Sequence, residues 1–323
     1  MTTRRRALGA LPMLALAAPA LGQEAWPARP VTLVVPWAPG GSTDTLARIL
    51  AQRVAADVGQ PILVDNRPGA SGTVGHLSVA RARPDGYTLL IGTNSTYAMA
   101  PHLLDSIPYD NERGFTPLGL LAYTPQYLCV HPALPARDVA GLLAHARANP
   151  GRLSYSSSGA GSSAHLAVEL FNAMAGIDML HVPYRGGAPA LQALIANEVQ
   201  FSAVDAVSAL QPMRAGAVRA VAVSSRERQP TAPDVPTVRE SGLPEFECST
   251  DFALFAPPEL PALLVARIHG AFAAALRAPE VRERLDTLAI LPVAGAPGDF
   301  AAYQRRESEK WGGIIRARNI RPG

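Results

Sequence analysis

The sequence has little of what enzymes and metalloproteins commonly use. Its seven histidines and two cysteines form no His-x-x-x-His or Cys-x-x-Cys pair, so the ligand spacing typical of zinc sites is missing. The serine-rich segment 156–163 lacks the Gly-x-Ser-x-Gly motif of a nucleophile elbow. No Gly-x-Gly-x-x-Gly fingerprint follows the first predicted strand, where Gly40 and Gly41 are adjacent. We therefore expect neither a metal nor a cofactor.

Lysine is almost absent, because Lys310 is the only lysine among 29 basic residues. Three of the arginines, Arg4 to Arg6, precede an apolar run from Ala7 to Ala20 and a small-residue site at 20–22, which is the layout of a secretory signal. Removing residues 1–22 takes away three arginines and no acid, which leaves 26 basic and 26 acidic residues. This balance argues against nucleic acid as a partner. No later stretch is apolar over the length that spans a bilayer.

Only two cysteines, Cys129 and Cys248, are present. An exported protein can pair them in a disulfide. Both lie in apolar, strand-like runs, which equally suits two buried free thiols. The spacing alone leaves both interpretations open.

The most informative stretch runs from Val31 to Asp44. Its apolar start predicts a buried strand, and Pro39-Gly40-Gly41 predicts a tight turn. Ser42, Thr43 and Asp44 are N-cap candidates for a helix whose apolar residues recur at helical spacing. A strand, a glycine turn and a helix N-terminus together favour an anion, because free N–H groups and the helix dipole both attract negative charge.

Strand and helix patterns alternate along the rest of the chain, which predicts a parallel sheet built from βαβ units. The strand predicted at 88–91 ends in a polar turn with Thr93 and Asn94. A second set of elements repeats the opening pattern at 153–171, with the loop Ser156–Ser163 between strand and helix. Apolar runs at about 127–131 and 246–256 are placed to cross between the two sets, and two crossings make a hinge and a cleft.

The loops at the strand ends allow two chemistries. A secreted hydrolase would use a serine of the 156–163 cluster with His165, although a histidine in a first helical turn usually serves as a polar structural residue. Carboxylate binding needs only backbone N–H groups, hydroxyls and helix N-termini, all of which are present. Tyr184 and Asp205 would face the far end of such a ligand, unless Asp205 simply caps a helix.

The chain resembles the Bug/TctC family of periplasmic solute-binding proteins of tripartite tricarboxylate transporters. The resemblance covers essentially all of the chain after the leader. It rests on motifs that occur in the following order: Trp26-Pro27 with Arg29-Pro30, Val34-Val35-Pro36-Trp37-Ala38-Pro39-Gly40-Gly41-Ser42-Thr43-Asp44, Asn66-Arg67-Pro68-Gly69-Ala70-Ser71-Gly72, Pro84-Asp85-Gly86-Tyr87-Thr88-Leu89-Leu90, Pro108-Tyr109-Asp110, His181-Val182-Pro183-Tyr184-Arg185-Gly186, Asp234-Val235-Pro236-Thr237-Val238 and Leu254-Phe255-Ala256-Pro257.

The resemblance implies an α/β fold of the two-lobed periplasmic-binding-protein (type II-like, Venus flytrap) kind with two hinge crossovers. Lobe 1 would comprise residues 26–127 and 250–323, and lobe 2 residues 128–249. A small carboxylate would be held in the cleft by loop backbone, hydroxyls and ordered water. The expected ligand-binding residues are Trp37, Ala38, Pro39, Gly40, Gly41, Ser42, Thr43, Asp44, Thr93, Asn94, Ser158, Gly159, Gly161, Ser162, Ser163, His165, Tyr184, Arg185 and Asp205.

Family members usually carry a tryptophan where this chain has Asp251. An acid at this position would either lie near the hinge or cleft and disfavour a second carboxylate, or lie in solvent. The resemblance further implies a periplasmic receptor that delivers its ligand to a membrane permease. The leader suits export by the Sec route and, through Thr3-Arg4-Arg5-Arg6-Ala7-Leu8, also by the twin-arginine route. A monomer is the default expectation for the oligomeric state. A ligand-loaded sensor for a membrane kinase is an alternative, because both roles use the closed form.

Overall fold

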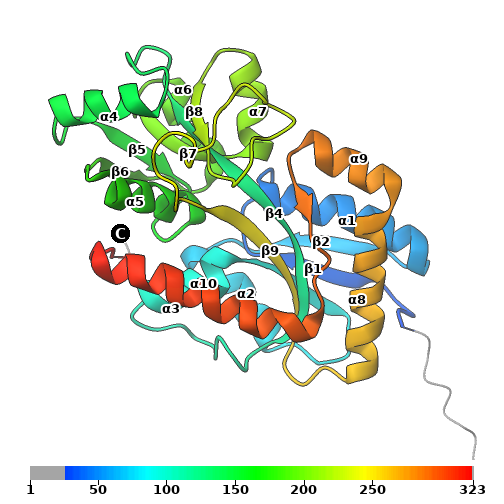
Figure 1. Cartoon of the computed structure of the whole chain (residues 1–323). Coiled ribbons are helices and arrows are strands. Elements are labelled where there is room, and N and C mark those ends of the chain that lie inside the picture. The colour runs from blue at the N-terminus through cyan, green and yellow to red at the C-terminus, as the bar shows by residue number, and fades with distance from the viewer. Residues whose placement is uncertain (1–25, 322–323) are drawn as a thin grey trace, which may run out of the picture.

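The computed structural model describes residues 26–321, so the predicted leader at 1–22 lies outside the described residues. The chain forms two α/β lobes whose sheets meet through shared long strands (Figure 1). This confirms the predicted two-lobed α/β architecture. None of the described helices is both long and apolar enough to cross a membrane.

The first lobe is built on a sheet with parallel strands at one edge. In that sheet β1 (Val31–Val35) lies between β2 (Ile62–Asn66) and β3 (Thr88–Thr93). Four of the five β1 side chains are fully buried, which suits a strand covered on both faces. Next to β3 come the antiparallel strands β9 (Ser249–Ala256), β4 (Thr116–Val130) and β10 (Leu291–Pro292).

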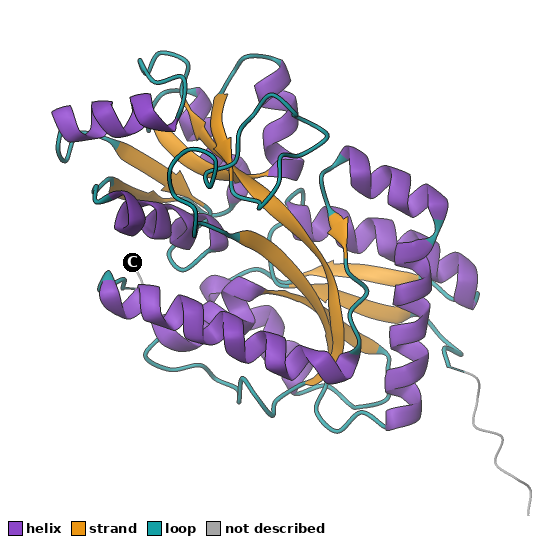
Figure 2. Ribbon diagram, in the orientation of Figure 1, coloured by secondary structure: helices purple, strands orange, loops and turns teal. Residues whose placement is uncertain are grey.

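Helices cover both faces of this sheet (Figure 2). One apolar cluster lies between the sheet and the helices α1, α8 and α9, and a second includes Trp311 and Ile315 of α10. The elements of the lobe are α1 (Ser42–Val58), the 3₁₀ turn η1 (Ala70–Gly72), α2 (Thr73–Ala80), the π-helical turn η2 (Ser95–Met99), α3 (Ala100–Leu103), α8 (Ala262–Arg277), α9 (Pro279–Thr287) and α10 (Pro297–Ala317).

The second lobe has a smaller sheet around the C-terminal half of β4. Its strands are β5 (Ser154–Ser157), β6 (Leu180–Pro183), β7 (Phe201–Asp205) and β8 (Arg219–Val223). Strand β4 pairs with both β7 and β8, and β5 joins β7 to β6. The helices are α4 (Val139–Ala148), α5 (Ser163–Ala175), α6 (Gly187–Ile195) and α7 (Ala206–Arg214).

The sequence pattern predicts two separate strands at 118–122 and 127–130, but one continuous strand, β4, covers both, so that part of the prediction is wrong. Pro125 lies within β4, where the partner of the strand changes from β9 to β7. A residue without an N–H is tolerated at such a transition. Strand β4 therefore belongs to both sheets and, with β9, connects the lobes (Figure 1).

Helix α10 provides a further connection between the lobes. It packs along η2 and α3 of the first lobe and ends beside α5 of the second (Figure 1). Just after its last turn, Arg318 Nε lies 3.1 Å from Glu169 Oε2 of α5. The boundaries predicted at 127 and 250 remain a prediction of where the two lobes separate.

Candidate functional site

A cavity of about 190 Å³ lies between the lobes. Segments from both lobes and from the crossover strand β9 line it. The lining residues are Trp37, Ala38, Pro39, Gly41, Ser42, Thr43, Thr93, Ser95, Ser158, Ser162, Ser163, Arg185, Gly186, Gly187, Ala188, Pro189, Asp205, Ser208 and Thr250. An outer chamber of about 500 Å³ shares Trp37, Ser158 and Arg185 with it and continues between the loops 68–72 and 158–160.

The first lobe contributes the turn between β1 and α1. Gly40 has a φ of +87°, a left-handed conformation that glycine adopts without strain. Its N–H donates to Asp44 Oδ2 at 3.0 Å, and Arg48 Nε donates to the same oxygen at 3.0 Å. Burial raises the pKa of Asp44, but these hydrogen bonds and the Arg48 charge outweigh it and leave that pKa below its usual value. A charged pair thus holds the turn.

The second lobe contributes the loop between β5 and α5. Ser162 is the N-cap of α5, and its Oγ accepts from His165 N at 3.2 Å. The N–H of Gly161 donates to His165 Nδ1 at 3.0 Å. The His165 ring stacks on the ring of His181 with 3.8 Å between centroids, and His181 Nε2 lies 2.7 Å from Ser157 Oγ. Two histidines thus hold the ends of this loop from behind.

Burial keeps both histidines neutral. It lowers the pKa of His165 to about 3, with a further lowering by His181, and it lowers the pKa of His181 to about 4. A neutral ring is required at His165, because its Nδ1 must accept the hydrogen bond from Gly161. The side chain of His165 therefore supports the loop and does not reach the cavity.

Residues from the first turns of four helices meet at the cavity. Ser42 and Thr43 begin α1, Ser163 begins α5, Gly187 and Ala188 begin α6, and Ser208 lies in the first turn of α7. Each helix N-terminus presents free N–H groups and a partial positive charge. With the hydroxyls and the Arg185 side chain, this arrangement favours an anion.

Asp205, the last residue of β7 in the second lobe, also lines the cavity. Ser42 Oγ donates to its Oδ2 across the cleft, and Thr250 Oγ1 donates to its Oδ1, both at 2.7 Å. Asp205 is the N-cap residue of α7, but its side chain makes no capping hydrogen bond. Burial raises its pKa, and the two hydroxyl donors partly offset that effect. A second bond across the cleft joins Ser163 N to Ser95 Oγ at 3.1 Å.

The cavity contains most of the residues predicted from sequence. Those that line it are Trp37, Ala38, Pro39, Gly41, Ser42, Thr43, Thr93, Ser158, Ser162, Ser163, Arg185 and Asp205. Gly159 lines the outer chamber. Gly40, Asp44, Asn94, Gly161, His165 and Tyr184 line neither chamber and instead support the loops around them; the Tyr184 hydroxyl, for example, donates to Glu198 at 3.2 Å.

The prediction missed several lining residues, including Ser95, Gly187, Ser208 and Thr250. Gly187 directly follows the quoted Tyr184-Arg185-Gly186 motif and opens α6, so its position was readable from the sequence. Ser95 belongs to η2, which no sequence pattern predicts, and Ser208 belongs to α7, which is considered only as the helix that Asp205 would cap. Thr250 lies in the predicted crossing run 246–256, but no local pattern indicates that its side chain lines the cavity.

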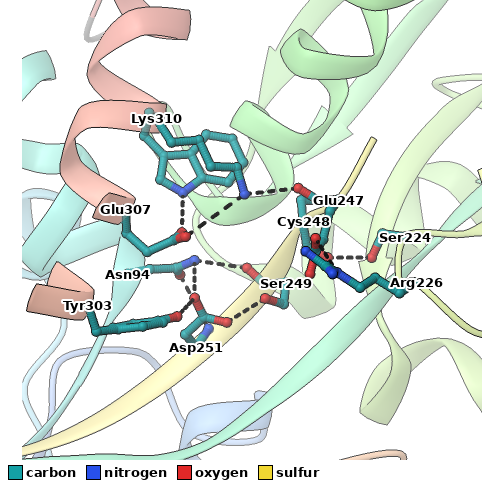
Figure 3. Close-up of polar contacts among 11 residues, drawn as sticks. Asn94, Ser224, Arg226, Glu247, Cys248, Ser249, Asp251, Tyr303, Glu307 and Lys310 are labelled. Atoms are coloured by element: carbon teal, nitrogen blue, oxygen red, sulfur yellow. Dashed lines mark hydrogen bonds and ion pairs between the residues drawn. The ribbon is translucent and has the colours of Figure 1, made fainter. Parts of the chain in front are cut away.

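Asp251 lies on the crossover strand β9 beside the lining residue Thr250, which agrees with the expected place near the hinge or cleft and excludes the alternative in solvent. Its residue is 2% exposed, and it lines neither chamber, so it lies neither in solvent nor at the cleft surface. Its neighbours are the polar side chains of Asn94, Ser249 and Tyr303 (Figure 3). The disulfide considered for Cys129 and Cys248 is not formed, and both are buried free thiols.

The hydrolase alternative finds no reactive serine in this geometry. Ser157 contacts His181, but its residue is 1% exposed and does not line the cavity. Of the cluster serines that do line it, Ser158 lies in the loop after β5, and Ser162 and Ser163 lie at the N-terminus of α5. The His165 ring is engaged elsewhere, because its Nδ1 accepts from Gly161 N. Within residues 26–321, no cluster of three or more His, Cys, Asp or Glu side chains is arranged to hold a metal.

Comparisons with known proteins agree with this geometry. Residues 46–320 match the model of the tripartite tricarboxylate transporter family receptor, TctC. A UPF0065 protein of Pseudomonas sp. (strain P51) is 41% identical over 316 residues, which cover 97% of this chain and 94% of the relative.

Two solved structures are also similar along most of their length. The structure of R. palustris Rpa4515 with adipate has a TM-score of 0.88 and 35% identity, and covers 92% of this chain and 100% of its own. The structure of MatC from Rhodopseudomonas palustris with bound malate has a TM-score of 0.83 and 36% identity, with 90% and 100% covered. The chain therefore belongs to the TctC (Bug) family of periplasmic solute-binding receptors, which are not enzymes.

Proposed function

We propose that this receptor captures a small organic carboxylate in the 190 Å³ cavity and delivers it to the membrane permease of a tripartite tricarboxylate transporter. The observation that carries this proposal is the meeting of four helix N-termini at one cavity rich in hydroxyl groups. Such a site neutralises a carboxylate mainly with dipoles, so the anion needs no fully buried ion pair. The structures of two relatives hold adipate and malate, which are small carboxylates.

The dimensions of the cleft support a ligand of metabolite size. The inner cavity is smaller than the roughly 300–1,000 Å³ typical of sites for drug-sized molecules. The outer chamber begins at Arg185 and Ser158, so the distal end of a longer acid would extend into it. The ligand-binding residues we propose are therefore those that line the inner cavity, with Arg185 at its junction with the outer chamber.

The cleft is closed by hydrogen bonds that cross from one lobe to the other. They join Ser42 to Asp205, Ser95 to Ser163, and Ser71 Oγ to the carbonyl of Ala160 at 3.4 Å. A ligand that bridges the same two walls would add its own contacts to this set and favour the closed form. We infer that residues 1–22 direct export to the periplasm by the Sec or twin-arginine route, and that the receptor acts there as a monomer.

A thermal-shift screen of residues 23–323 against malate, adipate, citrate and aromatic acids tests the proposal. An acid that binds only the folded protein raises the free energy of unfolding by about 2.7 kcal/mol at a hundredfold excess over Kd. Ser42→Ala should weaken the binding of a responding acid about tenfold, because it removes the cross-cleft hydrogen bond to the Asp205 carboxylate that helps to hold the closed form, and a hydrogen bond to a charged group contributes roughly 1.5 kcal/mol. Ser78→Ala is the matched control, because that hydroxyl donates to Gly75 O within α2, outside the lining.

If no carboxylate stabilises the protein, even after unfolding and refolding to release a co-purified ligand, the proposal is wrong. Delivery and signalling through a membrane kinase both use the loaded form, so growth separates them. Loss of the permease should stop uptake of the acid as completely as loss of the receptor does. Uptake that continues without the permease would favour the sensor.

A further inference from the structure

Asp251 is a buried carboxyl on β9, the strand that crosses between the lobes. Its Oδ2 accepts from Tyr303 OH of α10 at 2.5 Å and from Asn94 Nδ2 at 3.2 Å, and its Oδ1 accepts from Ser249 Oγ (Figure 3). Its backbone N–H contacts Asn94 Oδ1 at 3.4 Å. One carboxyl group therefore joins the crossover strand, helix α10 and the loop that follows β3.

Asp251 is next to the cavity without lining it. Thr250, its neighbour on β9, lines the cavity and donates to Asp205. Asn94, its hydrogen-bond partner, lies between Thr93 and Ser95, which both line the cavity. Because neighbouring residues on a strand point to opposite faces, Asp251 supports from behind the wall that Thr250 presents to the ligand.

The basic side chains around Asp251 form hydrogen bonds and ion pairs with other groups. Lys310 of α10 donates to the carbonyl of Glu247 at 3.0 Å and lies 4.0 Å from Glu307 Oε1, so other groups share its charge (Figure 3). Arg226 is paired with Glu247. The titratable and charged groups that face Asp251 are Tyr97 of η2, Tyr123 of β4, Cys248 before β9, and Tyr303, Glu307 and Lys310 of α10.

Burial raises the pKa of Asp251 to about 6, and Glu307 adds to the rise. Hydrogen bonds from Ser249 and Tyr303 and the charge of Lys310 act in the opposite direction. The proton of Asp251 is therefore exchanged near neutral pH, where small changes in the local charge alter its occupancy.

We propose that Asp251 is a positioning residue of the cleft that takes up a proton when an anionic ligand binds, so that the receptor holds its ligand more tightly in mildly acid than in mildly alkaline medium. The proposal rests on the carboxylate-binding function proposed above. A ligand charge at a distance of about 10 Å from Asp251 would be repelled by about 1.7 kcal/mol at an effective dielectric constant of 20, which corresponds to roughly tenfold in affinity. Linkage is reciprocal, so a proton on Asp251 strengthens anion binding by the same factor.

The first test needs no ligand. A carboxyl whose pKa is raised by folding stabilises the protein below the unfolded value of 3.8, and this stabilisation is lost as the pH rises through about 6. The Tm of the wild type should therefore fall relative to that of Asp251→Asn between pH 4.5 and 7.5. Parallel Tm profiles would overturn the proposal.

The second test measures the affinity for adipate and malate from pH 5 to pH 8. Wild type should lose about tenfold more affinity over this range than Asp251→Asn. The acids themselves titrate identically in both experiments, so the difference reports on the protein. Calorimetry in two buffers of different ionisation enthalpy should show uptake of protons by the wild type, reduced in the variant. If Asp251→Asn loses as much affinity over this range as the wild type, and Asp205→Asn loses less, the proton resides on Asp205 and the proposal is wrong.

Two variants on α10 separate proton linkage from simple structural support. Lys310→Gln keeps a donor for Glu247 O but removes the positive charge, so the midpoint of the pH dependence should move upward. Glu307→Gln keeps an acceptor for Trp311 Nε1 but removes the negative charge, so the midpoint should move downward. Shifts in the same direction, or none, would contradict the proposal. A further outcome is that the Tm profiles of these two variants shift in opposite directions but neither adipate nor malate binds. This outcome would contradict the proposed function and, with it, the coupling.

Discussion

The two loops that face each other across the cleft have the same local design but different supports. In the first lobe, the turn Pro36–Gly41 is held by the charged pair of Asp44 and Arg48. In the second, the loop Ser157–Ser163 is held by the stacked neutral rings of His165 and His181. Both loops thus combine a strand, a glycine turn and a helix N-terminus, whereas the side chains that hold each loop in place differ.

Acidification should produce the largest difference in stability between the two loops. The pKa values of His165 and His181 are lowered in the folded protein, so their stabilisation is present above the unfolded value of 6.5 and is lost as the pH falls toward 4 and 3. At pH 4 the loss amounts to roughly 3 kcal/mol for His165. Asp44 behaves differently, because its lowered pKa preserves its stabilisation until the pH falls below 3.8.

Hydrogen exchange at individual amides measures this contrast. Between pH 7 and pH 4, after correction for intrinsic rates, Gly161 and His165 should lose protection while Gly40 keeps it. Equal loss in both loops would show that the two supports are not independent.

Glycine substitution should also affect the two loops unequally. Gly161 has a φ of +76°, and a Cβ there would collide with the buried Leu103 side chain of the opposite lobe. We expect Gly161→Ala to lower the free energy of unfolding by about 2–3 kcal/mol and to weaken closure. Gly40→Ala meets no atom within 4 Å, so only the backbone strain of about 1 kcal/mol remains.

Urea unfolding and a distance measurement between the lobes would check this pair of variants. Gly161→Ala should populate a more open form, and Gly40→Ala should keep the wild-type spacing. An equal cost at both positions would mean that Leu103 moves aside freely.

The smallest effect should come from the ion pair of the first loop. The Arg48 side chain is 54% exposed, so the solvent screens its interaction with Asp44. Arg48→Met should cost less than about 1 kcal/mol in low salt, and this difference should nearly vanish in about 1 M salt. Denaturant titrations at the two salt concentrations measure it. A cost that salt leaves unchanged would indicate that packing of the Arg48 stem dominates.

The same contrast explains which features the sequence could predict. The strand, the glycine turn and the helix of the first loop follow local signals, and Asp44 and Arg48 are four residues apart on that helix. The predicted N-caps Ser42, Thr43 and Asp44 are wrong, because Gly41 is the N-cap and no side chain caps the helix. His165 and His181 lie on different elements, and the sequence does not indicate that their rings stack. The role of Asn94 depends on Asp251, which is 157 residues away. Contacts of this kind follow from the tertiary fold and leave no periodic signal.

Strand β4 makes the two lobes inseparable parts of one unit. It supplies a strand to both sheets, paired with β9 in the first and with β7 and β8 in the second. A fragment cut at the boundary between the lobes would leave one sheet with an unpaired edge and an incomplete core. Exchanging one lobe between relatives would therefore cut β4 or its pairing with β9 and disturb both sheets at once.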